Sequence, residues 1–500
     1  MMMKVRGGYR RAAVTGGSAA ALILALAPVS VRVATAAVAI PAASAISQSD
    51  KAQGAKAHPD LLAEFGGAVS GPQAAYVEQV GKTIAVQSGL SNARGDFTVT
   101  LLNSSVNNAF AIPGGYIYVT RQLTALMNNE AELAGVLGHE VGHVAARHSA
   151  KRQQAANRNQ IIGVLGSLLS GVLLGDSALG QLGQRIASQG SQMLTLQYSR
   201  TQELEADRLG ITYLKRAGYD PRAMASVLES LARQNALEAQ LRGTSNRVPE
   251  WASTHPDPAS RVRDAQSLAG KAASGATNRD VFLSRIDGLV YGDDPHQGVI
   301  EGNRFTHADL RFTFQAPDGF YLVNGTKAVS ISGASGKAQF SGGKLGTGLD
   351  SYIDGVFAAL TDKGQARIRP ESVERATVNG LSAAYGVARV QTSSGANEVA
   401  VFAYDLGGGN AYHFVTITRS GGAAVFNPMF KSFRRISAAE AGQVRPRMLR
   451  VVVVKTGDTS QSLARRMAFA DGQLDRFLVL NGLQAADKLV PGQKVKLVTY

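Results

Sequence analysis

Two histidines and a glutamate stand at the spacing His139-Glu140-x-x-His143 in the sequence. Glu140 is the only charged residue between positions 133 and 146, in an otherwise apolar run. On a helix, residues four apart share a face, so His139 and His143 could bind one metal ion together. Glu140 would lie about 100° round the helix, outside ligand position but within reach of a water on the metal. The pattern predicts zinc bound by two histidines, with Glu140 as general base.

The alternative is a buried helix that carries this short motif by chance. Asn129 and Glu132 form a capping-box-like pair that predicts a helix start, and no proline follows for many residues. A carboxylate and two imidazoles are costly to bury in an apolar helix unless a metal compensates them. We therefore favour zinc-peptidase chemistry.

A second helix is predicted to begin after Ser199, with Gln202 completing its cap. Glu203 and Asp207 are four apart and share a face, whereas Glu205 points the other way. A site of the gluzincin type needs one carboxylate from a second helix and leaves a fourth position for water. Glu203 would be this ligand, and Asp207 would orient a histidine ligand by accepting a hydrogen bond from it. The alternative is an acidic, solvated helix face.

These motifs together resemble the HtpX and CAAX-prenyl-protease family of zinc metallopeptidases, and within it the soluble periplasmic, BepA-like branch. The similarity covers roughly residues 55–270. It includes an edge-strand signature within 107–115 and Arg147-His148 at the helix end. The resemblance implies one zinc ion per chain. It implies His139, His143 and Glu203 as ligands and Glu140 as catalytic base.

The segment 251–256 is similar to the loop that places a histidine near the metal in this branch. His255 would then act in catalysis as a transition-state stabiliser, or it would be a reversible fourth ligand that keeps the enzyme latent. The alternative is a capping histidine before a helix from Pro258. His148 lacks the glycine spacing of metzincins, so we expect it to be structural.

Upstream of the motif, residues 72–88 are predicted to form a helix and 97–102 a strand. A turn at 113–115 precedes a strand at 116–119. The free edge of this last strand could pair with an extended peptide substrate. A plain scaffold strand is the alternative.

The N-terminus has a basic region, an apolar stretch and small-x-small sites, which is typical of a secretory signal peptide over residues 1–45. An uncleaved membrane anchor is the alternative. Cleavage would remove five basic residues and lower the net charge from +15 to +10. No dense basic run with interleaved aromatics occurs, so we expect no nucleic-acid partner. The absence of cysteine excludes thiolate metal sites and disulfides and is compatible with the periplasm.

The apolar, glycine-rich run at 161–175 is short for a membrane span. We interpret it as a mobile flap near the active site. A loop that dips into the membrane, giving peripheral membrane contact, is the second interpretation.

The predicted fold class is α+β multidomain. A mainly α-helical gluzincin metallopeptidase domain with a small edge sheet spans 46–270 and is followed by a linker at 271–278. Residues 279–437 are predicted to form an α/β sandwich and weakly resemble the PsbP/Mog1-like domains. A linker at 438–449 precedes residues 450–500, whose βααβ order resembles a LysM module. This resemblance implies binding to peptidoglycan; the alternative is a degenerate copy that only packs on its neighbour.

The predicted function is an exported, periplasmic and cell-wall-associated zinc endopeptidase. Its substrates, by resemblance, would be unfolded or misassembled envelope proteins. One alternative is a chaperone-like envelope scaffold with a latent metal site. A peptidoglycan hydrolase is a third interpretation, which the metal pattern disfavours.

Overall fold

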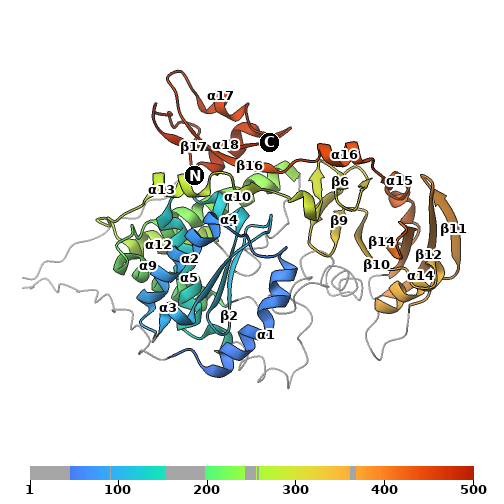
Figure 1. Cartoon of the computed structure of the whole chain (residues 1–500), viewed down its shortest axis with the longest axis horizontal. Coiled ribbons are helices and arrows are strands. Elements are labelled where there is room, and N and C mark those ends of the chain that lie inside the picture. The colour runs from blue at the N-terminus through green and yellow to red at the C-terminus, as the bar shows by residue number, and fades with distance from the viewer. Residues whose placement is uncertain are drawn as a thin grey trace, which may run out of the picture. The chain divides into compact units, whose positions relative to one another are not determined.

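The structure of the protein, a computed structural model, describes residues 45–90, 92–151, 198–242, 255, 258–360, 368–392 and 395–500 (Figure 1). The expected signal peptide up to residue 44 and the apolar run at 161–175 lie outside these residues. None of the helices in the described parts combines the length and apolar composition that a bilayer crossing requires.

The first core is built around helix α5 (Glu130–Ala145). The side chain of Asn129 accepts a hydrogen bond from the backbone N–H of Glu132 at 2.9 Å, so the predicted helix start is confirmed. Every residue of α5 except Val144 is buried. The helix therefore runs through the interior instead of along the surface.

Helix α9 (Arg200–Arg216) packs directly against α5, and glycines permit the close approach. A Cβ atom on Gly142 would lie 3.1 Å from the carbonyl oxygen of Ala206, and one on Gly210 would lie 3.0 Å from the backbone nitrogen of His139. Both distances are tighter than ordinary contacts. Small residues at these positions let the two backbones touch, and this brings side chains of α9 within reach of those of α5.

A three-stranded sheet lies beside α5, with the strand order β1-β3-β2. Strands β1 (Thr98–Leu102) and β3 (Tyr116–Thr120) are parallel, and β2 (Ala109–Ile112) is antiparallel to β3. Strand β3 is therefore central and β2 is an edge strand. The prediction that the strand at 116–119 has the free edge is wrong, because the chain turns back and places β2 outside it.

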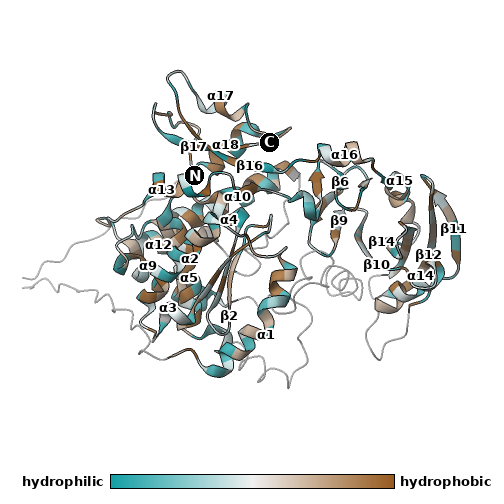
Figure 2. Ribbon diagram, viewed as in Figure 1, coloured by the Kyte–Doolittle hydropathy of each residue, from teal (hydrophilic) through white to brown (hydrophobic). Residues whose placement is uncertain are grey.

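Further helices surround this core. They are α1 (Gln48–Glu64), α2 (Pro72–Ala85), η1 (Val86–Ser88), α3 (Ala93–Asp96), α4 (Arg121–Leu126), α10 (Ala223–Arg242), α12 (Pro258–Ala269) and α13 (Arg279–Ile286). Helix α1, for example, carries both hydrophilic and hydrophobic residues (Figure 2), as expected where one face is buried. The predicted helix at 72–88 is confirmed as α2 followed by η1.

The central part of the chain is rich in antiparallel strands. One sheet has the order β11-β12-β13-β14-β10-β9-β8, and another has the order β15-β7-β6-β5. The strands are β5 (Val299–Glu301), β6 (Arg304–His307), β7 (Phe312–Gln315), β8 (Tyr321–Asn324), β9 (Val329–Gly333), β10 (Gly336–Lys344), β11 (Val373–Val378), β12 (Leu381–Thr392), β13 (Gly395–Asp405), β14 (Asn410–Arg419) and β15 (Arg434–Arg435). The helical elements are η2 (Pro295–Gln297), α14 (Leu349–Ala359), η3 (Ala423–Phe426), α15 (Asn427–Ser432) and α16 (Ala438–Gln443). Two aromatic and aliphatic clusters fill this part.

The C-terminal part has the predicted βααβ order. It consists of β16 (Arg447–Val453), α17 (Ser460–Ala464), α18 (Gln473–Leu480) and β17 (Lys494–Thr499). Strand β16 pairs with β17 on one side and with β4 (Val290–Tyr291) on the other. Phe477, Leu478 and Val495 belong to the same hydrophobic core as α5. The module therefore shares a core with the first part of the chain.

Lys496 joins β17 to the segment that precedes α5. Its side chain is fully buried, and Nζ donates hydrogen bonds to the carbonyl oxygens of Ala125 at 2.9 Å, Leu126 at 3.1 Å and Met127 at 2.6 Å. These carbonyls lie at the C-terminal end of α4, where the helix itself supplies no donors. Burial lowers the pKa of Lys496 to about 7, and the nearby carboxylate of Glu132 opposes this effect.

We expect Lys496→Met to lower the free energy of unfolding by about 2–4 kcal/mol, because it leaves buried carbonyls and a buried carboxylate without their cation. Urea unfolding of the full chain measures this change. The matched control is Lys488→Met, an exposed lysine in the same module, which should change the value by less than about 0.5 kcal/mol. Equal stability of the two variants would contradict the role given to Lys496.

Candidate metal centre

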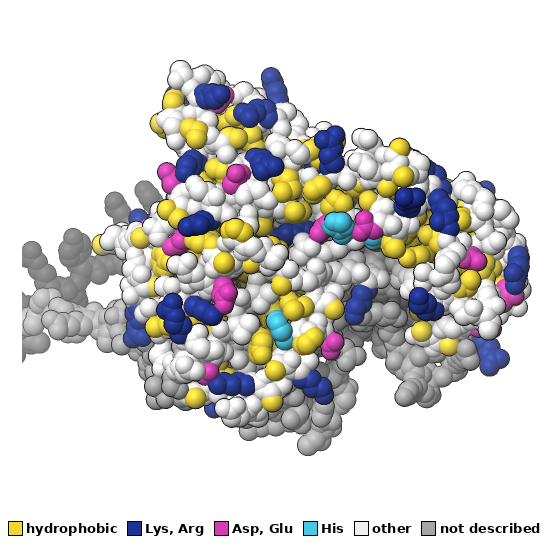
Figure 3. Space-filling view, viewed as in Figure 1, with side chains coloured by type: hydrophobic (Ala, Val, Ile, Leu, Met, Phe, Trp, Pro, Cys, Tyr) yellow, Lys and Arg dark blue, Asp and Glu magenta, His cyan; other side chains and the backbone are white. Residues whose placement is uncertain are grey.

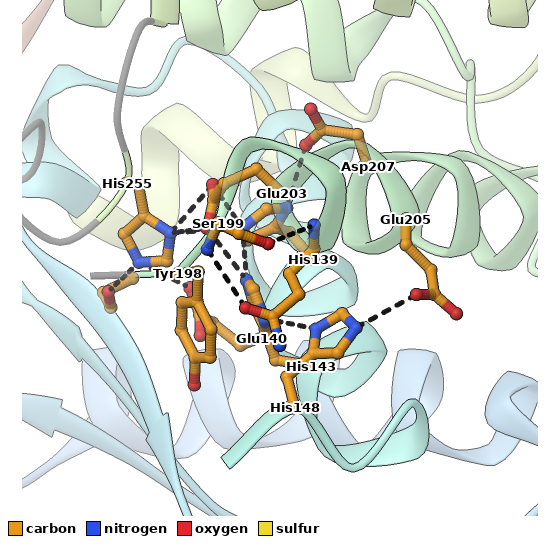
Figure 4. Close-up of polar contacts among 12 residues, drawn as sticks. His139, Glu140, His143, His148, Tyr198, Ser199, Glu203, Glu205, Asp207 and His255 are labelled. Atoms are coloured by element: carbon orange, nitrogen blue, oxygen red, sulfur yellow. Dashed lines mark hydrogen bonds and ion pairs between the residues drawn. The ribbon is translucent and has the colours of Figure 1, made fainter. Parts of the chain in front are cut away.

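Four side chains from three segments converge at one point between α5 and α9 (Figure 4). One potential ligand atom from each of them lies within 4.8 Å of all the others, and all four residues are buried. They are His139, His143, Glu203 and His255. The two helices and the residue just before α12 thus bring together the ligands predicted from sequence and the histidine expected near them.

The distances among these atoms suit a metal ion. The Nε2 atoms of His139 and His143 are 3.0 Å apart, and the carboxylate oxygens of Glu203 lie 3.5 Å and 3.4 Å from them. Ligands at 2.0–2.1 Å from a tetrahedral zinc ion lie about 3.3 Å from one another. The donor set of two imidazoles and a carboxylate is also one that zinc accepts.

Charge balance gives a second test of the fit. Three buried carboxylates, those of Glu140, Glu203 and Asp207, face one buried guanidinium, that of Arg261. With the histidines neutral, as metal ligands are, the ionised cluster carries an excess of two negative charges away from water, which is unfavourable without a compensating charge. A divalent cation would restore neutrality.

Glu140 is positioned to act on a bound water. Its carboxylate is fully buried, and neither oxygen has a hydrogen-bond partner among the described residues. Nε2 of His255 lies 3.5 Å from Oε1 of Glu140. Burial raises the pKa of Glu140, and the neighbouring histidines oppose this shift. A carboxylate with free acceptors beside a candidate metal site can exchange a proton there.

His139 is held by a carboxylate and a guanidinium behind it. Its Nδ1 lies 2.8 Å from Oδ1 of Asp207, as expected for the residue predicted to orient a histidine ligand. Arg261 donates to both Asp207 oxygens, at 2.7 Å and 2.6 Å, and its Nη1 lies 2.6 Å from Glu203. Burial raises the pKa of Asp207, but Arg261 and His139 outweigh it and lower the value to about 2.

Arg261 was not among the site residues predicted from the sequence. The available signal is its place on α12, one turn before the buried Ala265 and two turns before the buried Ala269. A cation on the apolar face of a helix needs an anionic partner in the core.

His148, which we expected to be structural, contacts one of the candidate ligands. Its Nδ1 lies 2.8 Å from Nδ1 of His143, and its Nε2 lies 3.2 Å from Oε2 of Glu205. Glu205 does point away from Glu203, and it reaches His148 instead. The ring of Tyr198 stacks on that of His143, with centroids 3.7 Å apart.

His255 lies inside the ligand cluster, which is the position expected of a fourth ligand. Its Nδ1 is 3.1 Å from both oxygens of Glu203 and 3.3 Å from Nε2 of His139. Its Nε2 lies 3.2 Å from the carbonyl oxygen of Ala109 in the edge strand β2. The imidazole therefore contacts both the candidate ligands and the strand beside them.

Comparison with known proteins gives two domain matches. The model of peptidase family M48 matches residues 72–269, and the LysM domain model matches residues 452–498. The beta-barrel assembly-enhancing protease of Yersinia pestis is 33% identical over 225 residues, which cover 44% of this chain and 44% of that protein. The mitochondrial metalloendopeptidase OMA1 of Schizosaccharomyces pombe is 30% identical over 220 residues, covering 43% of this chain and 59% of that protein.

This chain thus spans less than two thirds of the length of these relatives. Cyanobacterial PsbP from Synechocystis superposes on 28% of this chain and 98% of its own, at 14% identity and a TM-score of 0.22. That score is too low to support a conclusion, so the PsbP/Mog1-like assignment and the domain boundaries stay predictions. The resemblance predicted from the motifs is confirmed at the level of domains: residues 72–269 match the model of peptidase family M48, and residues 452–498 match the LysM domain model.

Proposed function

We propose that this protein is a zinc-dependent endopeptidase. The observation that carries the proposal is the convergence of two imidazoles and one carboxylate at ligand spacing, next to a buried carboxylate with free acceptor atoms. His139, His143 and Glu203 would hold one zinc ion. The family match and the names of the relatives, a protease and a metalloendopeptidase, support the same activity.

When bound, zinc supplies Lewis-acid polarisation of a water and of the substrate carbonyl. The residues of the chain do the rest. Glu140 accepts the proton of the attacking water at its carboxylate and returns it to the leaving amine. Asp207 holds Nδ1 of His139, which keeps Nε2 directed at the metal position. Arg261 balances the charge of Asp207 and Glu203 in the buried site.

Strand β2 offers a place for the substrate. As an edge strand it has one row of backbone groups that β3 does not pair, and an extended peptide can add to such a row. One of these groups is the carbonyl oxygen of Ala109, which lies within hydrogen-bond distance of Nε2 of His255. The other ring nitrogen of His255 contacts Glu203. We propose that His255 is the reversible fourth ligand and that it keeps the enzyme latent.

The proposed substrates are unfolded or misassembled envelope proteins in the periplasm. The signal-like N-terminus and the name of the Yersinia relative, a beta-barrel assembly-enhancing protease, support this assignment.

Peptidoglycan would be bound by the LysM domain, whose loops at 455–459 and 484–493 are largely exposed. Basic side chains are spread over the visible face without gathering in one patch (Figure 3).

A second function, a chaperone-like scaffold with a latent metal site, is favoured by one observation. Nε2 of His255 lies 3.5 Å from Oε1 of Glu140 and 3.2 Å from the carbonyl oxygen of Ala109 in β2, so His255 occupies the edge on which a substrate strand would pair. Client binding without cleavage by the native protein would support this second function.

We expect Glu140→Gln to reduce cleavage of casein by about 10²- to 10⁴-fold, because the variant loses the general base. Zinc content should stay near one ion per chain, since Glu140 is not a ligand. The control is Glu229→Gln on α10, an exposed position that should leave both quantities unchanged. Full activity of Glu140→Gln would refute the peptidase proposal.

We expect His255→Ala to raise the turnover of casein roughly tenfold, the equivalent of one broken hydrogen bond of about 1.4 kcal/mol. His296→Ala, at an exposed histidine outside the site, is the control. Reduced turnover at constant zinc content would assign transition-state stabilisation to His255. Unchanged kinetics and zinc content would remove it from the site.

A further inference from the structure

We propose that His148 and Glu205 form a positioning dyad that holds His143 in its metal-binding orientation. This inference rests on the metal site proposed above and assigns a role to two residues outside the ligand set. The role of the dyad depends on the hydrogen atoms that His143, His148 and Glu205 can share.

The two ring nitrogens of His143 face opposite sides, one toward the other candidate ligands and one toward His148. Its Nε2 faces Nε2 of His139 at 3.0 Å and Oε1 of Glu203 at 3.4 Å, so Nε2 is the atom directed at the metal. Its Nδ1 points to the opposite side, where it meets Nδ1 of His148 at 2.8 Å. The contact between the two rings therefore lies behind the ligand atom.

Only one arrangement of hydrogens serves this geometry. A metal-binding imidazole offers its lone pair at one nitrogen and carries its hydrogen on the other. His143 must then donate from Nδ1, and His148 must accept at Nδ1. The hydrogen of His148 lies on Nε2, from which it can be donated to Oε2 of Glu205 at 3.2 Å. The carboxylate thus fixes the tautomer of His148, and His148 fixes that of His143.

The local backbone is built to bring His148 into this place. Helix α5 ends at Ala145, and Arg147 adopts a left-handed conformation with φ of 55°, which is unfavourable for a residue with a side chain. The turn at 146–147 interrupts the helix, and His148 directly after it contacts His143 of α5. Tyr198 covers the face of the His143 ring while His148 fixes its edge. Rotation of the His143 ring is restricted in both directions.

The two histidine ligands are supported in different ways. His139 is backed by a buried aspartate that Arg261 neutralises. His143 is backed by a buried imidazole whose own partner, Glu205, has a side chain that is 45% exposed. The second arrangement places less charge in the core, because its carboxylate reaches solvent.

The test compares three replacements of His148 in the full chain, with the zinc dissociation constant measured by chelator competition. His148→Phe removes the acceptor, and we expect zinc affinity to fall about 10- to 100-fold. His148→Asn places an amide oxygen near the position of Nδ1 and should restore affinity to within about threefold of the native value. His148→Gln reaches toward Glu205 without this acceptor and should behave like the phenylalanine variant.

Absorption of the cobalt-substituted protein provides a second measurement. The Phe and Gln variants should show a changed visible spectrum, and the Asn variant the native one. Thermal unfolding of the zinc-free chain separates a general loss of stability from a loss of ligand orientation. Glu205→Gln should weaken zinc binding by only a few fold, because its amide oxygen still accepts a hydrogen bond, and Glu229→Gln is the neutral control.

Native affinity in both the Phe and Gln variants would overturn the dyad. An Asn variant as weak as the Phe variant would also overturn it, since the acceptor would then have no effect. If the phenylalanine variant does not fold, the comparison of Asn with Gln still decides. A native chain that binds no zinc would refute the proposed function, and the dyad with it.

Discussion

Everything at the candidate centre depends on how buried charges are balanced in a space without water. Three carboxylates and one guanidinium lie within the same core, and the carboxylates exceed the guanidinium by two charges. Isolated charges of this kind are strongly unfavourable in a low-dielectric interior. The arrangement is stable only where each carboxylate has a cation or donor. Arg261 forms ion pairs with Asp207 and Glu203. The negative charge that remains is equal in size to the positive charge of one divalent cation.

The local elements of the site were accessible from sequence because their signals are local. The Asn129 cap and the Ser199–Gln202 capping box fix the starts of α5 and α9, and the i, i+4 spacing fixes which side chains share a face. The βααβ order of the C-terminal part also followed from turn residues and apolar runs. The free edge was predicted on the strand at 116–119 and lies on β2 instead, because which strand is central depends on pairing among all three strands.

The roles of residues that act through tertiary contacts were not predicted from the sequence. Nothing near Arg261 in the sequence indicates Asp207, which lies 54 positions earlier. His148 and Glu205 are 57 positions apart and meet only after α5 and α9 pack together. The alternation of polar and apolar residues around Lys496 is typical of a half-exposed strand. Lys496 is nevertheless buried against α4. In each case a partner from a distant segment overrides the local pattern.

The contact between α5 and α9 sets a tolerance on the whole centre. Metal–ligand distances must be met to within about 0.2 Å. A single methyl group at Gly210 would crowd the backbone of His139 at 3.0 Å and the end of Met224 at 2.8 Å, and the helices would have to part to admit it. Loss of metal can therefore arise at a position that has no donor atom. A survey of variants that fail to bind metal should therefore include the glycines between α5 and α9 as well as the ligands.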